Sequence, residues 1–212
     1  MRTYPKIQSV FKRDPENNHR TFIDGDWSDP AFGYLAENEW EATEKIDGTN
    51  MRIGFNEGTF RVGGRTESSQ IHSDLMEHVY EIGDRCSGVL EGLTLFGEGY
   101  GAGIQKGGGD YRPDKGFILF DVQVTESGIW LERENIRDIA RTHGMPHVAT
   151  SYVGPLKTII EHVSLGFDTP SAEGDRQAEG FVMRPIIELN GRMGNRIITK
   201  IKLKDYPDRL KT

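Results

Sequence analysis

The chain has 212 residues, which suits one large domain that buries most of its apolar side chains. Its 35% hydrophobic residues, 28% charged residues and 26 glycines are typical of a soluble, turn-rich protein and exclude a low-complexity protein. A net charge of −7 argues against a protein that coats nucleic acids nonspecifically. One cysteine, Cys86, excludes an internal disulfide, and no stretch resembles a membrane span or a signal peptide. We therefore expect an intracellular, cytoplasmic protein.

Polar residues dominate the first part of the chain. Residues 14–39 are rich in Asp, Asn, Gly and Pro and predict a long surface excursion. Two strand-like segments follow at residues 40–43 and 51–55, separated by a turn at Asp47 and Gly48.

Helical periodicity appears between the strand-like segments. It predicts one helix after a Ser73 cap, a charged helix over residues 132–141, and a third after Gly154-Pro155. A second polar excursion is expected over residues 166–177, and each excursion is either a substrate-facing loop or an ordinary surface loop. Alternating strands with helices between them predict an α+β domain of antiparallel sheets with peripheral helices.

Lys45 stands at the end of the first strand-like segment, directly before the Asp-Gly turn. A turn there would lift one ammonium group into a cleft, where a covalent lysine nucleophile belongs. The pattern Lys-x-Asp-Gly by itself equally fits a hairpin lysine in solvent, because Asp-Gly turns are common.

Three lysines at two-residue spacing mark the last predicted strand. Alternation places Lys200, Lys202 and Lys204 on one face of this strand and apolar residues on the other. Like charges repel, so an anion such as the phosphates of a nucleotide would stabilise the lysine face. The alternative is an exposed edge strand that lysines protect from unwanted pairing.

Six short motifs in a fixed order resemble those of a known superfamily. They are Glu44-Lys45-Ile46-Asp47-Gly48-Thr49-Asn50, Arg65, Gly97-Glu98-Gly99, Phe120, Glu179-Gly180-Phe181 and Lys200-Ile201-Lys202-Leu203-Lys204. The set is similar to motifs I to V of the covalent nucleotidyltransferases, which are the ATP-dependent DNA ligases, the RNA ligases and the mRNA-capping guanylyltransferases. The resemblance runs from Glu44 almost to the last residue.

Three details resemble the RNA ligase 2 branch of the RNA ligases. Glu44 directly precedes the lysine, Asn50 rather than arginine ends the first motif, and a glycine-rich stretch, residues 101–107, follows Glu98. The opening residues 4–13 are similar to those of phage RNA ligases, and a phage-encoded protein would act in the host cytoplasm.

This resemblance implies a nucleotidyltransferase (ATP-grasp-like ligase adenylation) domain, with residues 1–212 forming one adenylyltransferase domain. Only eight residues follow Lys204, so we expect no OB-fold and no further C-terminal domain. An accessory protein would then bind the RNA substrate in place of such a domain.

The resemblance further implies a three-step reaction that uses ATP. Lys45 takes AMP from ATP, the AMP passes to an RNA 5′-phosphate, and an RNA 3′-hydroxyl displaces it, as in the repair of RNA ends or nicked duplexes. The lysine amine attacks only when it is neutral, and the positive charges of Lys200 and Lys202 would favour that form. Mg²⁺, or Mn²⁺ in its place, would neutralise the phosphates.

The same resemblance assigns further roles. Glu98 would hold the ribose hydroxyls, Phe120 would stack on adenine, and Glu179 would bind the metal, largely through water. The remaining nucleotide-binding residues are Glu44 at the adenine edge, Asp47 at the ribose or the metal, Asn50, Arg65 at the ribose or nicked end, and Lys200, Lys202 and Lys204. Both lysine pairs fit the last motif; we favour Lys200 and Lys202, because Tyr206 then lies four residues beyond the motif.

Two other functions fit the same residues. A minimal ATP-dependent DNA ligase is disfavoured by Asn50 and by the expected lack of an OB-fold. A catalytically silent RNA-end-binding module is disfavoured because it would not need Lys45, Glu98 and Glu179 together.

Overall fold

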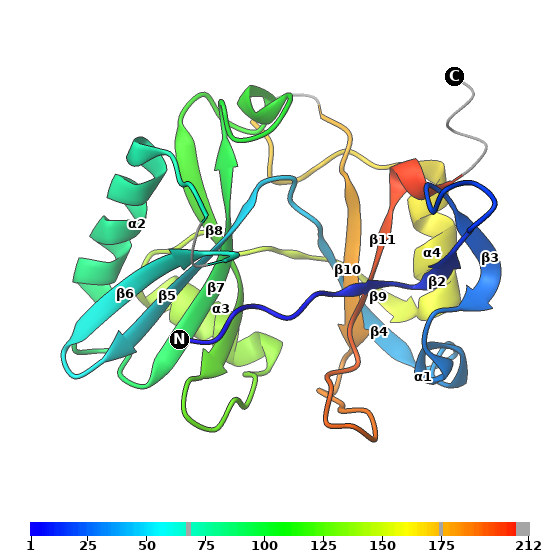
Figure 1. The fold of residues 1–212 in the computed structure, drawn as a ribbon, viewed down its shortest axis with the longest axis horizontal. Coiled ribbons are helices and arrows are strands. Elements are labelled where there is room, and N and C mark those ends of the chain that lie inside the picture. Colours follow the sequence, from blue (N-terminus) through cyan, green and yellow to red (C-terminus); the bar gives the residue numbers. More distant parts are fainter. Residues whose placement is uncertain (67–68, 174–175, 207–212) are drawn as a thin grey trace. The chain divides into compact units, whose positions relative to one another are not determined.

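The computed structural model describes residues 1–66, 69–173 and 176–206 (Figure 1). These residues form two compact units, each assembled from segments that are separate in the sequence. Unit 1 contains residues 1–5, 47–148 and a short segment that begins at Ser171. Unit 2 contains residues 6–46, 149–170 and the part of the chain from Arg176 on. The chain therefore passes from unit 2 to unit 1 between Ile46 and Asp47, at the start of the predicted turn.

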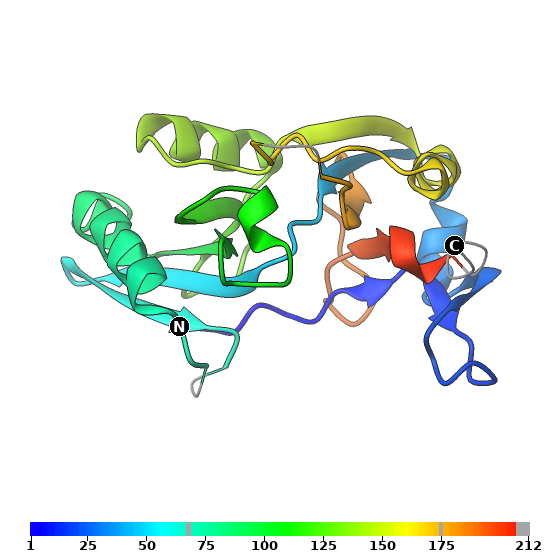
Figure 2. The same cartoon turned by 90° about the horizontal axis from the view of Figure 1, so that it is seen from above.

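Unit 1 is built on a four-stranded antiparallel sheet with the strand order β6-β5-β7-β8. The side chains of Met51, Ile53 and Phe55 alternate onto one face of this sheet and share a core with residues of α2 and α3. Figure 2 shows both helices beside the sheet. The elements are β5 (Thr49–Asn56), β6 (Thr59–Gly64), α2 (Ser73–Cys86), β7 (Leu93–Gly101), the short η1 (Gly108–Asp110), β8 (Lys115–Val124) and α3 (Arg133–Thr142).

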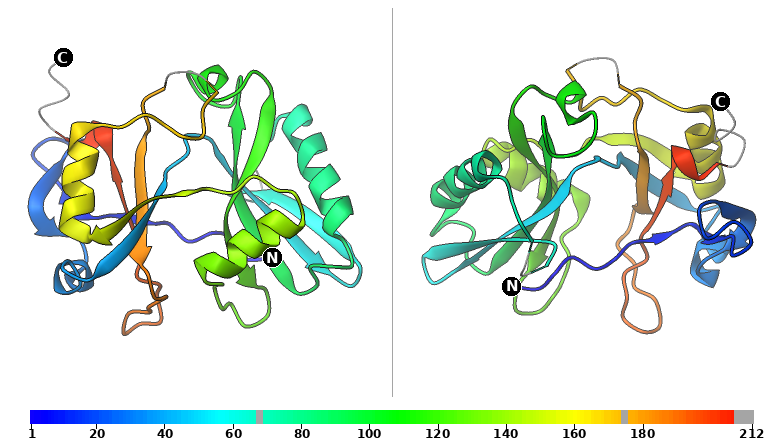
Figure 3. Two further views of the ribbon diagram at one scale, coloured as in Figure 1. Left: turned by 180° about the vertical axis from the view of Figure 1, so that it is seen from behind. Right: turned by 45° about the horizontal axis from the view of Figure 1, so that its top comes forward.

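Unit 2 contains a five-stranded sheet with the order β1-β11-β10-β4-β9, in which only the β1–β11 pair is parallel among the described strands. Helix α4 lies against this sheet (Figure 3). Its Ile159 and Val163 share a core with Trp40 and Phe181. The elements are β1 (Gln8–Ser9), β2 (Phe11–Arg13), β3 (Phe22–Trp27), α1 (Pro30–Tyr34), β4 (Glu39–Glu44), β9 (Thr150–Pro155), α4 (Leu156–Leu165), β10 (Gly180–Pro185), β11 (Thr199–Lys202) and the short η2 (Leu203–Asp205).

The α+β class with antiparallel sheets and peripheral helices is confirmed, as are the three predicted helices, which are α2, α3 and α4. The predicted N-cap of α2, Ser73, is wrong. His72 occupies the N-cap position, and the hydroxyl of Ser73 inside the helix donates to Asp74 at 2.9 Å.

The prediction of a long polar excursion over residues 14–39 is also wrong. These residues contain β3 and α1, and Phe22 and Phe32 from them are buried in the core of unit 2. Asp29 caps α1 by accepting a hydrogen bond from the Ala31 amide at 2.9 Å. The overall polar composition of this segment did not indicate that a few of its apolar residues belong to the core. Of the second excursion, 166–177, residues 174–175 lie outside the described residues.

The strands on either side of Lys45 exist but do not form a hairpin. β4 pairs with β9 and β10, whereas β5 pairs with β6 and β7. A hairpin lysine is therefore excluded. The edge-strand interpretation of the last strand is excluded as well, because β11 lies between β1 and β10. The strand ends at Lys202, so Lys204 leaves the lysine face and lies in η2.

None of the helices in residues 1–66, 69–173 and 176–206 has the length and apolar character that a membrane span requires.

Candidate functional site

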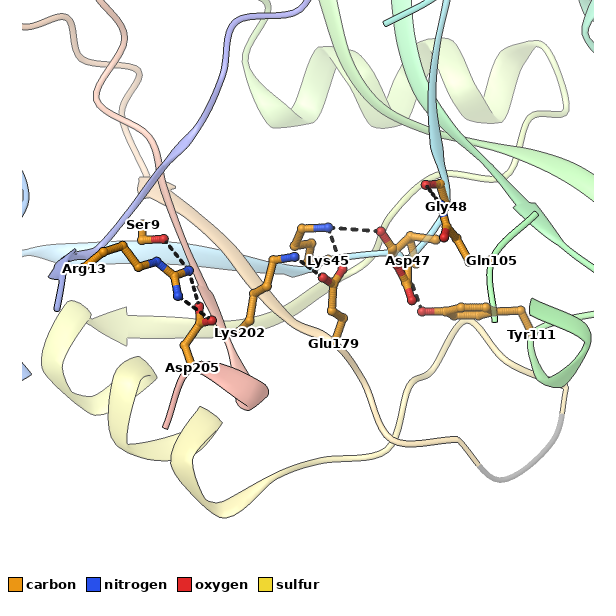
Figure 4. A network of polar contacts seen from close by, with 11 residues as sticks. Ser9, Arg13, Lys45, Asp47, Gly48, Gln105, Tyr111, Glu179, Lys202 and Asp205 are labelled. Carbon is orange, nitrogen blue, oxygen red and sulfur yellow. Dashed lines mark hydrogen bonds and ion pairs between the residues drawn. The ribbon is translucent and has the colours of Figure 1, made fainter. Parts of the chain in front are cut away.

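Lys45 follows β4 directly. Its amide donates to the carbonyl of Gly180 at 2.9 Å, so the pairing of β4 with β10 continues through this residue and fixes its backbone. The side chain is 20% exposed, and its Nζ lies 2.5 Å from Oε2 of Glu179 (Figure 4). One lysine of unit 2 is thus held against a carboxylate and remains partly open to solvent.

Glu179 also binds a second lysine. The Nζ of Lys202 donates to Oε1 of Glu179, so this carboxylate, which is 11% exposed, bridges two ammonium groups. Burial alone would raise the pKa of Glu179, but the charges of Lys45 and Lys202 and their hydrogen bonds outweigh burial and lower it. The carboxylate is therefore ionised at neutral pH.

Lys200 lies two residues before Lys202 on β11 and, by alternation, on the same face. Burial, followed by the nearby charges of Lys202 and Lys45, lowers the pKa of Lys200 to about 8. Near pH 8 this ammonium group is half deprotonated. Lys204, by contrast, is exposed in η2. The structure therefore gathers Lys200 and Lys202 with Lys45 and leaves Lys204 outside the cluster.

Gly180, next to Glu179, is required by a close approach of two strands. A Cβ atom at Gly180 would lie 2.0 Å from the Ile201 carbonyl oxygen and 2.7 Å from Cα of Lys202. Its φ of +151° is also one that side chains disfavour. The absence of a side chain lets β10 approach the part of β11 that carries the lysines.

Glu44 is the last residue of β4, and its side chain lies on the core face of the sheet. The residue is 3% exposed and pairs in register with Phe181, which belongs to the core under α4. The hydroxyl of Thr169 donates to Oε1 of Glu44, whereas Oε2 has no hydrogen-bond partner within the described ranges. Glu44 is thus adjacent to Lys45 in sequence, but its carboxylate lies in the interior of unit 2.

In unit 1 the Asp-Gly turn is held by the loop that follows β7. The amide of Asp47 donates to the hydroxyl of Tyr111 at 3.2 Å, and Nε2 of Gln105 donates to the carbonyl of Gly48 at 3.0 Å (Figure 4). A Cβ atom at Gly48 would lie 2.2 Å from the carbonyl oxygen of Gly99, so only glycine fits against β7 here. The turn is therefore fixed in place within unit 1.

Two predicted nucleotide-binding residues of unit 1 are direct neighbours across strands. Asn50 of β5 pairs in register with Glu98 of β7, and both side chains are half-buried. The Oδ1 of Asn50 is buried and, among the residues described, has no hydrogen-bond partner. Arg65 follows β6 directly and is exposed.

Phe120 of β8 packs against an aromatic residue from the N-terminal segment. The rings of Phe120 and Tyr4 lie 5.0 Å apart and meet edge to face, and the hydroxyl of Tyr4 donates to Asp121 at 2.8 Å. Phe120 itself is half-buried. The ring of Phe120, the predicted stacking residue, is therefore supported by Tyr4 and remains partly accessible.

Several residues that sequence analysis did not select support these groups. Tyr111 and Gln105 hold the Asp-Gly turn, and Thr169 holds Glu44. They lie 64, 57 and 125 residues from their partners in the sequence, and no local pattern signals such contacts. The glycine-rich stretch around Gln105 was the one signal that pointed to this loop.

Comparison with solved structures shows which fold this is. The chain is similar to the RNA ligase of Naegleria gruberi in a mutant form with ATP and Mn (TM-score 0.63, 17% identity, 92% of this chain and 56% of that chain). Similar values hold for a mutant with AMP and Mn (0.66, 16%, 98% and 60%) and for the ligase with PPi (0.64, 17%, 98% and 59%). The chain thus has the fold of these ligases and spans about three fifths of their length.

The family follows from the sequence itself. The model of the RNA ligase family matches residues 38–202, a segment that includes every motif from Glu44 to Lys202. The chain belongs to the RNA ligase family. Curated proteins give no significant match by sequence.

Proposed function

We propose that residues 1–212 form one adenylyltransferase domain, composed of both units, of an ATP-dependent RNA ligase in the RNA ligase 2 branch. The observation that carries this proposal is the cluster in unit 2, where Glu179 bridges Lys45 and Lys202 with Lys200 beside them. A lysine that is held at a strand end, partly open to solvent and surrounded by cations suits attack on a phosphate. The family match and the nucleotide-bound ligases of the same fold support it.

The first step forms the lysyl-AMP intermediate. The amine of Lys45 loses its proton, its nitrogen bonds to the α-phosphorus of ATP, and the bond to pyrophosphate breaks. Lys200 and Lys202 stabilise the negative charge that develops on the phosphates. In the second step the AMP is transferred to an RNA 5′-phosphate, and in the third an RNA 3′-hydroxyl displaces AMP and forms the phosphodiester bond.

The residues of unit 1 bind the nucleoside. Phe120 stacks on adenine, Glu98 and Asn50 bind the ribose side, and Arg65 contacts the ribose or the RNA end. Phe120, Glu98 and Asn50 are half-buried, and the buried Oδ1 of Asn50 has no hydrogen-bond partner in the described part of the chain, which supports these roles. Glu44 acts at the adenine edge through its main chain, because its carboxylate is buried under α4.

A divalent cation fits the chemistry of the carboxylates. Mg²⁺ prefers oxygen ligands and keeps most of its waters, and Glu179 is an ionised, largely buried carboxylate next to Lys45. Glu179 would hold the ion through water, and Asp47 is the second candidate. When bound, Mg²⁺ or Mn²⁺ neutralises phosphate charge. The nucleotide-bound ligases of the same fold contain Mn.

The three lysines of the last motif should differ in effect. Lys200→Ala and Lys202→Ala should each lower the rate of AMP transfer to the protein by about 100-fold, because each removes a charge from the phosphate site. Lys204→Ala should change the rate less than about twofold, since Lys204 is exposed in η2. Single-turnover labelling with ATP measures all three. A larger loss in Lys204→Ala than in Lys200→Ala would assign the motif to the other lysine pair.

The proposed function is tested by labelling and chase. The protein is incubated with labelled ATP or GTP and Mg²⁺, and the adduct is chased with nicked duplexes that carry RNA or DNA on the 3′-hydroxyl side. We expect label from ATP alone and sealing that prefers RNA, because a 2′-hydroxyl offers an additional donor and acceptor near the reacting end. Sealing should weaken with salt, since phosphate contacts dominate nucleic-acid binding.

Each of the other outcomes would support a different function for this protein. Equal rates on DNA-ended and RNA-ended nicks would support the minimal DNA ligase. Binding of RNA ends without any AMP adduct would support the silent RNA-end-binding module. Label from GTP rather than ATP would indicate a capping-type guanylyltransferase.

A further inference from the structure

An ion pair between a partly exposed arginine and a buried carboxylate connects the turn after β11 with the N-terminal strands of unit 2. Arg13 of β2 donates from Nη1 to Oδ1 and from Nη2 to Oδ2 of Asp205, each at 2.7 Å (Figure 4). Nη2 also donates to Oγ of Ser9 at 3.0 Å, and Nη1 to the Arg20 carbonyl at 3.2 Å. The Asp205 side chain is 4% exposed. Such a bidentate pair fixes both the distance and the orientation of the two segments.

The same N-terminal segment also contacts β11, the strand that carries Lys200 and Lys202. Ser9 pairs with Lys200 in parallel register, and the amide of Val10 donates to the Lys200 carbonyl at 2.9 Å. β11 is only four residues long, and Asp205 lies just three residues beyond Lys202. The segment 9–13 therefore holds β11 at Lys200 through the main chain and beyond Lys202 through the ion pair.

Arg13 also acts on Lys200 through its charge. The charged groups that face Lys200 are Lys202 on its own strand, Lys45 after β4, Glu179 before β10, and Arg13 on β2. After burial, Lys202 and Lys45, the guanidinium of Arg13 contributes to the lowering of the Lys200 pKa, whereas Glu179 opposes it. Loss of the Arg13 charge should therefore raise this pKa.

We propose that Arg13 and Asp205 form a positioning pair that keeps Lys200 and Lys202 in place for the phosphates of ATP. This inference rests on the proposed function. The pair touches neither the nucleotide nor Lys45 in this role, and it acts through the backbone of β11 and the turn after it. Nothing in the motif itself requires Arg13, which lies 32 residues before Lys45 in the sequence.

The test uses the full chain with four variants. Arg13→Gln and Asp205→Asn each break the bidentate pair, Arg13→Lys keeps the charge but not the fork, and the double variant removes both partners. Lys12→Gln is the matched control, because Lys12 is the neighbour of Arg13 on β2 and its side chain forms an exposed ion pair with Asp26. Thermal unfolding identifies any variant that does not fold.

We expect kcat for AMP transfer to fall by at least about tenfold in Arg13→Gln and in Asp205→Asn, because small misplacements of catalytic groups are costly. The double variant should be no worse than the poorer single variant. In the pH profile of kcat/KM, which reports groups of the free enzyme, the alkaline fall should move to higher pH in Arg13→Gln, because loss of the guanidinium raises the Lys200 pKa, but not in Arg13→Lys, which keeps the charge. Lys12→Gln should match the wild type in rate and profile.

The outcomes separate this inference from the function on which it rests. A wild type that takes no AMP refutes both. An active wild type with folded Arg13→Gln and Asp205→Asn variants of normal kcat refutes the positioning pair alone. If Arg13→Gln does not fold, Arg13→Lys decides. A normal kcat in Arg13→Lys overturns the proposal, whereas a lowered kcat in this folded variant, which lacks the two-nitrogen contact with Asp205, supports it.

Discussion

Lys45→Ala should not acquire AMP when it is incubated with ATP and Mg²⁺, whereas the wild type should gain one AMP in an acid-labile bond on Lys45. The reason is chemical, because the lysine nitrogen is the atom that bonds to phosphorus. The variant should fold, since the side chain is 20% exposed and its removal leaves the contact between Glu179 and Lys202. Intact-mass measurement and peptide mapping detect and locate the adduct.

Two controls make this result specific. Lys204→Ala removes an exposed lysine and should keep the adduct. Lys45→Arg keeps a positive charge beside Glu179 but provides no nucleophile, so it too should remain unlabelled. Label on Lys45→Ala, or a wild-type adduct that maps to another lysine, would refute the assignment of the nucleophile.

Gly48→Ala should lose both stability and activity. A Cβ atom would lie 2.2 Å from the Gly99 carbonyl oxygen and 2.7 Å from Cγ of Glu98, so the turn must move away from β7. Overpacking of this kind costs about 1–3 kcal/mol of unfolding free energy. Because the turn begins two residues after Lys45, its displacement should also slow AMP transfer by about 100-fold. Urea unfolding and single-turnover labelling measure the two effects.

Gly109→Ala is the matched control in the same unit. Gly109 is exposed in η1, and the nearest atom to its added Cβ would be Cβ of Ala102 at 3.9 Å, an ordinary contact. This variant should behave as the wild type. Normal rates in Gly48→Ala would show that the Asp-Gly turn adapts without effect on the lysine, contrary to the close packing described here.

Much of this protein follows from its sequence alone. Period-two alternation predicted the strands around Lys45 and Lys200, and helical spacing predicted α2, α3 and α4. These are local properties, set by which side chains recur on one face. The motifs from Glu44 to Lys202 likewise indicated the family that the family model supports. Function could be proposed early because the chemistry resides in a few residue types at fixed spacing.

Sequence patterns failed where an outcome depended on residues far apart. The strands before and after Lys45 were expected to flank a simple turn, yet they belong to different sheets, because pairing partners are chosen by long-range packing. β11 was ambiguous between a lysine face and a free edge until its pairing with β1 covered that edge. Residues 14–39 appeared too polar for a core, although Phe22 and Phe32 enter it.

The sequence therefore determined which groups carry the chemistry, whereas only the tertiary structure decided how they are arranged. Alternation placed Lys200, Lys202 and Lys204 on one face, but β11 ends at Lys202, and the turn held by Asp205 takes Lys204 away. Glu179 likewise meets Lys45 and Lys202 from positions 134 and 23 residues away. Local propensity encodes an element and its exposed face, whereas the contacts that bring charged side chains together form only when distant strands pair and their cores are buried.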